Sequence, residues 1–104
     1  MEKIYNKLVR DKIPEIIQKD GKKAVLRTLT EEEFLQELNK KMKEELDEYL
    51  KSGDIMELVD LGEVMHAILA IRNMPISEYQ RLRVEKHEAR GGFDQRLFLE
   101  KVIE

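Results

Sequence analysis

The sequence predicts an all-α protein, a helical bundle built around a central antiparallel helix hairpin. Three observations lead to this fold class. Apolar residues recur at helical spacing through residues 31–51, and residues 55–71 are apolar almost all the way round a helix. Helix start and stop signals flank both segments. Only a short turn at Ser52 and Gly53 separates them. A turn this short makes the two helices antiparallel neighbours.

The first expected element is a short helix that begins near Pro14 and ends near Gly21. Proline is favoured in the first turn because its missing N–H group needs no partner there, and glycine is favoured just beyond the last turn. Residues 3–12, which precede this helix, mix apolar and basic residues without a clear period. Residues 24–29, which follow it, are expected to form a short extended segment.

The first helix of the hairpin has a clear start and a clear end. Thr30 followed by Glu33 is the capping-box pattern, in which reciprocal hydrogen bonds satisfy free N–H groups of the first turn. The helix is expected to run to about Lys51, where Ser52 and Gly53 end it.

The second helix of the hairpin begins after Asp54, with Glu57 three residues later, and is expected to run to about Arg72. Pro75 then ends the helical pattern of apolar residues.

The C-terminal part of the chain is more polar. Ser77 is expected to cap a fourth helix that runs to about Ala89. Residues 90–93, with two consecutive glycines, are expected to form a turn. Residues 95–103 fit either a strand or a helix.

The composition narrows the class of protein. The chain has 104 residues, of which 41% are hydrophobic and 39% charged, so we expect a single globular domain over 1–104. A net charge of −3 argues against binding to a nucleic acid polymer. No segment resembles a membrane span or a signal peptide, so we expect a cytoplasmic protein that does not bind membranes. The absence of cysteine excludes disulfides and thiolate metal sites.

Acidic residues fall at positions of the hairpin where apolar residues are expected. At about 100° per residue, Glu45 lies inside the apolar arc of helix 31–51 and Glu48 lies at its border. Helix 55–71 has no polar face, so it requires burial on most sides, which we expect an oligomer to complete. This helix nevertheless carries Glu57 and Asp60. Both acid pairs have i, i+3 spacing, which places their side chains on adjoining helix surface.

These four acids are candidate metal ligands. A buried carboxylate needs a cationic partner, a raised pKa or a metal ion. Lys41 and Arg72 are too few to neutralise four acids, and a ligand set made only of oxygen suits Mg²⁺ or Mn²⁺. The alternative interpretation is that glutamates at this spacing are ordinary solvated charges.

The acidic motifs resemble a known superfamily. The pattern at residues 44–48, Glu-Glu-Leu-Asp-Glu, followed by Glu-Leu-Val-Asp at 57–60, is similar to the EExxE…ExxD signature of the all-α NTP pyrophosphohydrolases, which include the MazG proteins. The sequence NKLVRDKIP at residues 6–14 and RGGF at 90–93 resemble its phosphoribosyl-ATP pyrophosphohydrolase-like branch. The resemblance implies a helical bundle of the MazG-like fold, assembled as a homodimer or homotetramer.

The resemblance also implies an activity and a site. The reaction is hydrolysis of the α–β phosphoanhydride of a nucleoside triphosphate or related nucleotide, giving the monophosphate and pyrophosphate. The implied Mg²⁺ ligands are Glu45, Glu48, Glu57 and Asp60. Glu45 or Glu48 is the candidate general base. The candidate phosphate-binding residues are basic groups on either side of the acidic motifs, Lys7, Arg10, Lys12, Lys86 and Arg90, each of which is otherwise a solvated charge.

Two other functions stay open. Glu63 and His66 form an E-x-x-H unit, which di-metal carboxylate (ferritin-like) bundles use in pairs. Alternatively, the apolar helix 55–71 serves a non-enzymatic helical interaction module.

Overall fold

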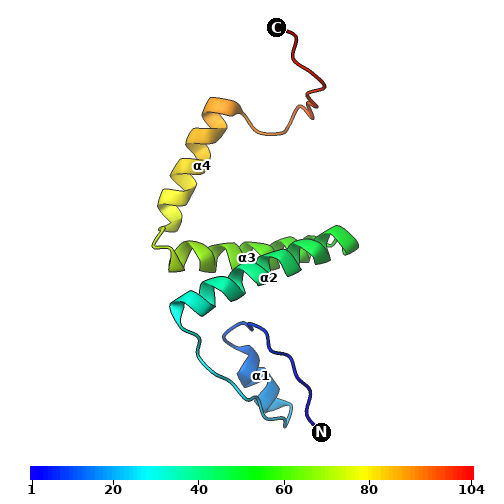
Figure 1. Cartoon of the computed structure of the whole chain (residues 1–104), viewed down its shortest axis with the longest axis vertical. Coiled ribbons are helices and arrows are strands. Elements are labelled where there is room, and N and C mark those ends of the chain that lie inside the picture. The colour runs from blue at the N-terminus through cyan, green and yellow to red at the C-terminus, as the bar shows by residue number, and fades with distance from the viewer. The chain divides into compact units, whose positions relative to one another are not determined.

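The computed structural model describes residues 1–104 and is all-α, with four helices and no strand. The helices are α1 (Ile13–Lys19), α2 (Glu31–Ser52), α3 (Ile55–Ile71) and α4 (Ile76–Arg90). α2 and α3 pack side by side as an antiparallel hairpin (Figure 1). The predicted all-α class and the central hairpin are therefore confirmed, whereas the helical bundle around the hairpin stays a prediction. None of the four helices combines the length and the apolar character needed to cross a membrane.

The chain divides into two compact units, Met1–Asn73 and Met74–Glu104. The first holds α1, α2 and α3, and the second holds α4 and the C-terminal tail. The expectation of one domain over the whole chain stays a prediction.

The hairpin starts and turns where the sequence predicts. The hydroxyl of Thr30 accepts a hydrogen bond from the backbone N–H of Glu33, whose carboxylate accepts one from the N–H of Thr30. Gly53 ends α2 with a φ of 68°, a left-handed conformation that glycine adopts at low cost. The side chain of Asp54 then accepts a hydrogen bond from the N–H of Met56 and starts α3. Local capping signals are therefore sufficient to set both helix boundaries at the turn.

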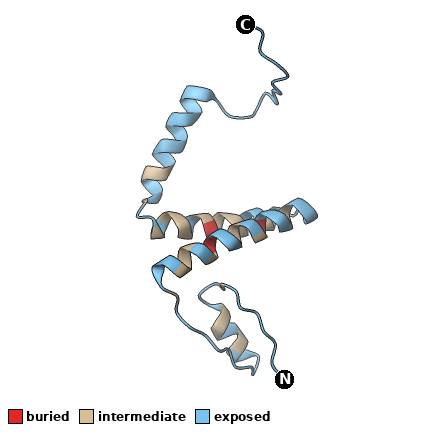
Figure 2. Cartoon of the chain, in the orientation of Figure 1, coloured by how far each residue is buried: buried red, intermediate tan, exposed pale blue.

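Three residues are buried, and all lie on α2 and α3 (Figure 2). Leu38 and Val64 form the apolar part of this core, with exposed fractions of 2% and 8%. The third is Glu45, only 6% exposed. Leu38 and Glu45 lie about two helical turns apart on α2, so they share the stripe that faces α3. A carboxylate thus occupies a position of the helix–helix seam that is normally apolar.

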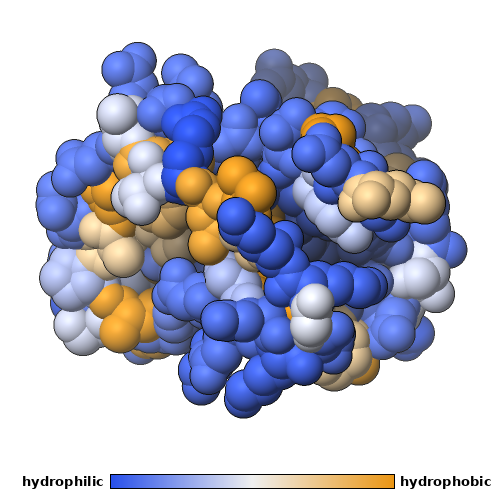
Figure 3. Space-filling model, turned by 90° about the horizontal axis from the view of Figure 1, so that it is seen from below, coloured by the Kyte–Doolittle hydropathy of each residue, from blue (hydrophilic) through white to orange (hydrophobic).

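Within the first unit, α2 is the helix that packs along α3. Apolar residues around the turn of the hairpin are exposed, and we call them the hairpin-end surface: Leu46, Leu50, Ile55, Met56, Leu58 and Val59. Exposed hydrophobic side chains also appear in patches among charged ones in Figure 3. The burial expected on most sides of α3 is therefore not provided within one chain.

The region after α3 differs from its prediction in two places. α4 begins at Ile76 with Pro75 as its N-cap and no side-chain cap, so the predicted cap at Ser77 is wrong and that residue lies inside the first turn. Pro75 already has the extended conformation of an N-cap residue, with φ −60° and ψ 143°.

The C-terminal tail is the second difference. Residues 95–103 form neither a strand nor a helix. No strand exists in the chain to pair with this segment, its side chains are exposed, and Arg96 has a left-handed φ of 56°, which interrupts both kinds of repeat. Residues 24–29, expected to be extended, belong to no helix and no strand, and their extended conformation stays a prediction.

Candidate metal centre

Three of the predicted ligands converge between the hairpin helices. Glu45 from α2 and Glu57 and Asp60 from α3 each offer a carboxylate oxygen, and these three oxygens lie within 4.8 Å of one another. The hairpin explains this convergence. Glu45 and Asp60 each lie about two helical turns from the turn at Gly53, so antiparallel packing places them at the same height.

Glu45 is the most deeply placed of the three acids. Its Oε1 lies 3.6 Å from the Nζ of Lys41, whereas its Oε2 is buried and has no hydrogen-bond partner. Burial raises the pKa of Glu45, and the negative charge of Glu48 adds to this effect, while Lys41 opposes it. The buried Oε2 is therefore an acceptor that no donor of the chain satisfies.

Glu57 is partly buried and forms no ion pair with a basic side chain. Its desolvation, its hydrogen bond with Glu48 and the negative charges of Glu48 and Glu45 raise its pKa to about 7. The carboxylates therefore place more negative charge in the seam than the nearby cations balance.

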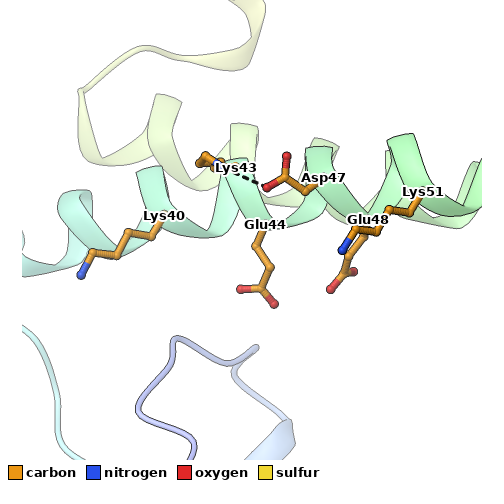
Figure 4. Close-up of a pocket in the computed structure, with 6 residues that line it drawn as sticks. All are labelled: Lys40, Lys43, Glu44, Asp47, Glu48 and Lys51. Atoms are coloured by element: carbon orange, nitrogen blue, oxygen red, sulfur yellow. Dashed lines mark hydrogen bonds and ion pairs between the residues drawn. The ribbon is translucent and has the colours of Figure 1, made fainter.

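Glu48 lies beside Glu57 but outside the group of three converging oxygens. Its side chain is exposed and borders a surface pocket on α2 (Figure 4). The pocket is lined by residues of this one helix, Lys40, Lys43, Glu44, Asp47, Glu48 and Lys51. Lys43 and Asp47 are ion-paired at 2.9 Å along this face. This pocket is therefore formed by an outward face of α2, not by the seam that holds the carboxylate group.

Asp60 already has a cationic partner. The Nη2 atom of Arg10 donates a hydrogen bond to its Oδ1 over 2.7 Å. The two side chains are 54% and 42% exposed. Arg10, predicted to bind phosphate, is thus placed at the carboxylate group by the N-terminal segment. The sequence did not predict this contact, because residues 3–12 carry no helical or strand period that would place them.

Two other candidate phosphate-binding residues of the first unit, Lys7 and Lys12, form no ion pair with the carboxylate group. Lys7 lies over the ring of Tyr5, with its Nζ 5.8 Å from the ring centre, and Lys12 is the N-cap residue of α1. Lys86 and Arg90 belong to α4 in the second unit. Their role in binding phosphate stays a prediction.

The E-x-x-H unit is separate from this site. Glu63 and His66 are exposed, and neither belongs to the group of converging acids.

The geometry fits a small divalent cation. Magnesium binds oxygen at about 2.1 Å, so two of its ligands lie at most about 4.2 Å apart. The three oxygens, within 4.8 Å of one another, need only a small inward movement to reach that spacing. Their donor set consists of hard oxygen atoms, and one of the three residues, Glu45, has a buried oxygen without a hydrogen-bond partner. The residues present therefore suit Mg²⁺ or Mn²⁺.

Comparisons with known proteins do not assign a family. No family model matches the chain, and no solved structure matches it. An uncharacterised protein of Mycolicibacterium smegmatis is 45% identical to it over 47 residues, which is 45% of this chain and 47% of that protein. The chain thus spans about half the length of this relative.

Proposed function

We propose that the protein is a Mg²⁺-dependent nucleotide pyrophosphohydrolase that cleaves the α–β phosphoanhydride of a nucleoside triphosphate or related nucleotide. The observation that carries this proposal is the convergence of Glu45, Glu57 and Asp60 from two adjacent helices, with a buried Glu45 oxygen that has no partner. The resemblance of the acidic motifs to the all-α NTP pyrophosphohydrolases supplies the reaction.

The carboxylate group and its buried, unpaired oxygen favour a divalent cation over a purely structural role. A buried acceptor without a hydrogen bond costs about 1–3 kcal/mol. Lys41, at 3.6 Å from the other oxygen of Glu45, does not satisfy this acceptor. Glu57, without a basic partner, adds like-charge repulsion. One ion with two positive charges would both satisfy the buried acceptor and reduce the repulsion between the carboxylates.

The proposed mechanism assigns separate roles to the acids. When bound, Mg²⁺ neutralises phosphate charge and makes water more acidic. Glu45, Glu57 and Asp60 would hold the ion. Mn²⁺ could replace Mg²⁺ there, because it prefers the same oxygen ligands. Glu48 is exposed beside Glu57 and outside the ligand group, so it is better placed than Glu45 to accept a proton from the water that attacks the α-phosphorus. Basic residues then neutralise the phosphates of the substrate.

The fold and the assembly belong to the same proposal. The all-α hairpin agrees with the MazG-like fold that the motifs resemble. We propose that a homodimer or homotetramer covers the hairpin-end surface and encloses the nucleotide, because the apolar residues of that surface are exposed in a single chain.

The test is release of pyrophosphate from a panel of nucleoside triphosphates and phosphoribosyl-ATP, with Mg²⁺ and with EDTA. Glu57→Gln removes a proposed ligand, and Asp47→Asn is the matched control, because Asp47 is an exposed acid on α2 paired with Lys43. Changes to residues that only support the metal ligands typically lower activity 10- to 100-fold. We expect Glu57→Gln, which alters a ligand itself, to lower activity by more than this, and Asp47→Asn to stay near wild type. Release from no substrate, or equal release by Glu57→Gln and wild type, would contradict the proposal.

The second candidate function is a non-enzymatic interaction module, which the exposed hairpin-end surface favours. It differs from the first in its response to metal: a module needs no Mg²⁺ binding at Glu57. The di-metal carboxylate alternative has less support, because Glu63 and His66 are exposed and lie outside the group.

A further inference from the structure

The N-terminal segment brings a cation to the site at which we place the metal. Arg10 Nη2 lies 2.7 Å from Asp60 Oδ1, and this is the only ion pair between residues 1–12 and the hairpin. The charge of the sequence is arranged to match. Residues 1–30 carry eight basic and four acidic side chains, whereas residues 31–60 carry four basic and eleven acidic ones.

We propose that Arg10 is the resident counter-ion of the carboxylate group and that a divalent cation displaces it from Asp60. The inference rests on the proposed metal site and goes beyond the phosphate-binding role predicted for Arg10. It makes Arg10 a residue that sets the affinity for metal, in addition to any contact with substrate.

Two physical points support an exchange over simultaneous binding. A guanidinium hydrogen-bonded to Asp60 is close enough to repel an ion held by that same carboxylate. The Arg10–Asp60 pair is half exposed on both sides, and exposed ion pairs are weak, so an ion that also binds Glu45 and Glu57 can replace it.

Displacement leaves the Arg10 guanidinium without its partner, and no other ion pair joins residues 1–12 to the hairpin. The remaining basic contacts of the segment are local, because Lys3 and Lys7 lie over the ring of Tyr5. Arg10 is then free to bind a phosphate oxygen of an incoming nucleotide. Metal binding and phosphate binding are thereby coupled through one side chain, and the segment loses its anchor to α3 when metal binds.

The first test measures the affinity of the full chain for Mg²⁺ and Mn²⁺ by calorimetry at low salt. Arg10→Gln removes the counter-ion. Lys22→Gln is the control, because it removes one positive charge from the same basic region at a residue without an ion pair. We expect Arg10→Gln to bind metal about fivefold more tightly, the value of a good exposed ion pair, and Lys22→Gln to match wild type. The difference should shrink at high salt.

The outcomes separate this inference from the proposed function. Equal or weaker metal binding by Arg10→Gln overturns the exchange while leaving the metal site intact. Metal binding by wild type without release of pyrophosphate overturns the enzyme but not the exchange. Wild type that binds no divalent cation overturns both.

A second readout follows the segment itself. The chain has no cysteine, so Val9→Cys gives a single position for a nitroxide label next to Arg10. We expect the label to become more mobile when Mg²⁺ is added, and to be mobile with or without Mg²⁺ when Arg10→Gln is also present. A label that Mg²⁺ leaves unchanged or immobilises would overturn the inference.

Discussion

Glu57 and Glu48 face each other near the turn of the hairpin without a basic side chain to separate their charges. The Nζ of Lys41 lies 3.5 Å from Glu44 and 3.6 Å from Glu45, and it forms no ion pair with Glu48 or Glu57. Desolvation by burial, the hydrogen bond with Glu48 and this charge repulsion together favour the protonated form in the metal-free protein and raise the pKa of Glu57 to about 7. A bound cation would also reduce the repulsion. Protonation and metal binding compete for the same carboxylate, because a metal ion binds its deprotonated form.

This competition predicts how stability depends on pH. Below pH 4.5, the usual pKa of the group, folded and unfolded chains both hold the Glu57 proton. Between pH 4.5 and about 7 the unfolded chain loses this proton while the folded chain keeps it. The metal-free protein should therefore lose stability as pH rises through this window. Burial raises the pKa of Glu45 as well, which acts in the same direction. Thermal unfolding in EDTA across this range measures the effect.

Two comparisons make the pH prediction specific. Glu57→Gln carries no titrating proton, so its stability in EDTA should depend less on pH in the same window. Saturating Mg²⁺ should reverse the wild-type trend, because the ion binds the deprotonated carboxylates. Wild-type stability that rises from pH 4.5 to 7 in EDTA would show that these acids are paired with cations in solution.

The turn of the hairpin gives a prediction at the level of a structural element. Gly53 has a φ of 68°, and a Cβ atom placed there would meet nothing within 4 Å. Gly53→Ala should therefore cost only the conformational penalty, about 1–2 kcal/mol of unfolding free energy.

Gly62 is equally free of neighbours but lies in the middle of α3. Gly62→Ala should stabilise the protein by about 0.5–1 kcal/mol. Denaturant unfolding checks both values, and changes of the same sign would contradict this reasoning.

The same local physics explains how much of the fold the sequence could predict. Capping boxes and αL glycines act within a few residues, so both ends of α2 and the start of α3 were predictable from Thr30, Gly53 and Asp54. Ser77 failed as a cap because Pro75, two residues earlier, already provided the extended entry to α4. Residues 95–103 could not be assigned, because a strand depends on a pairing partner that lies elsewhere in the chain.

The candidate site was likewise predictable only where local rules apply. Convergence of Glu45, Glu57 and Asp60 follows from helical spacing and the short turn, so three of the four predicted ligands come together. Glu48 lies on the exposed edge, as its place at the border of the apolar arc indicates. The contact of Arg10 with Asp60 spans two segments without a shared period and was not predictable by local rules. The only signal for it was the contrast between a basic N-terminal region and an acidic hairpin.

Burial over the whole molecule is incomplete. Leu38 and Val64 are the only apolar residues that the chain buries, and the hairpin-end surface is open. A small chain buries a smaller share of its surface than a large one, and contiguous exposed apolar surface marks a contact with another molecule. A second copy is the partner we propose, since it would cover α3 on the sides that α2 leaves free.

Substitution of two residues of the hairpin-end surface tests this assembly. Leu50 and Val59 are 70% and 52% exposed in the single chain, so lysine at both positions should leave the chain's own core intact. Burial of each of these side chains stabilises an interface by about 1.5–3 kcal/mol, and their joint loss should weaken association by 100-fold or more. Light scattering coupled to gel filtration should find a dimer or tetramer for wild type and a monomer for Leu50→Lys with Val59→Lys. Val84→Lys, at an exposed apolar residue of α4, is the control and should keep the wild-type mass. A wild-type chain that is monomeric at high concentration would contradict the assembly, because the open surface would then have no copy of this chain as its partner.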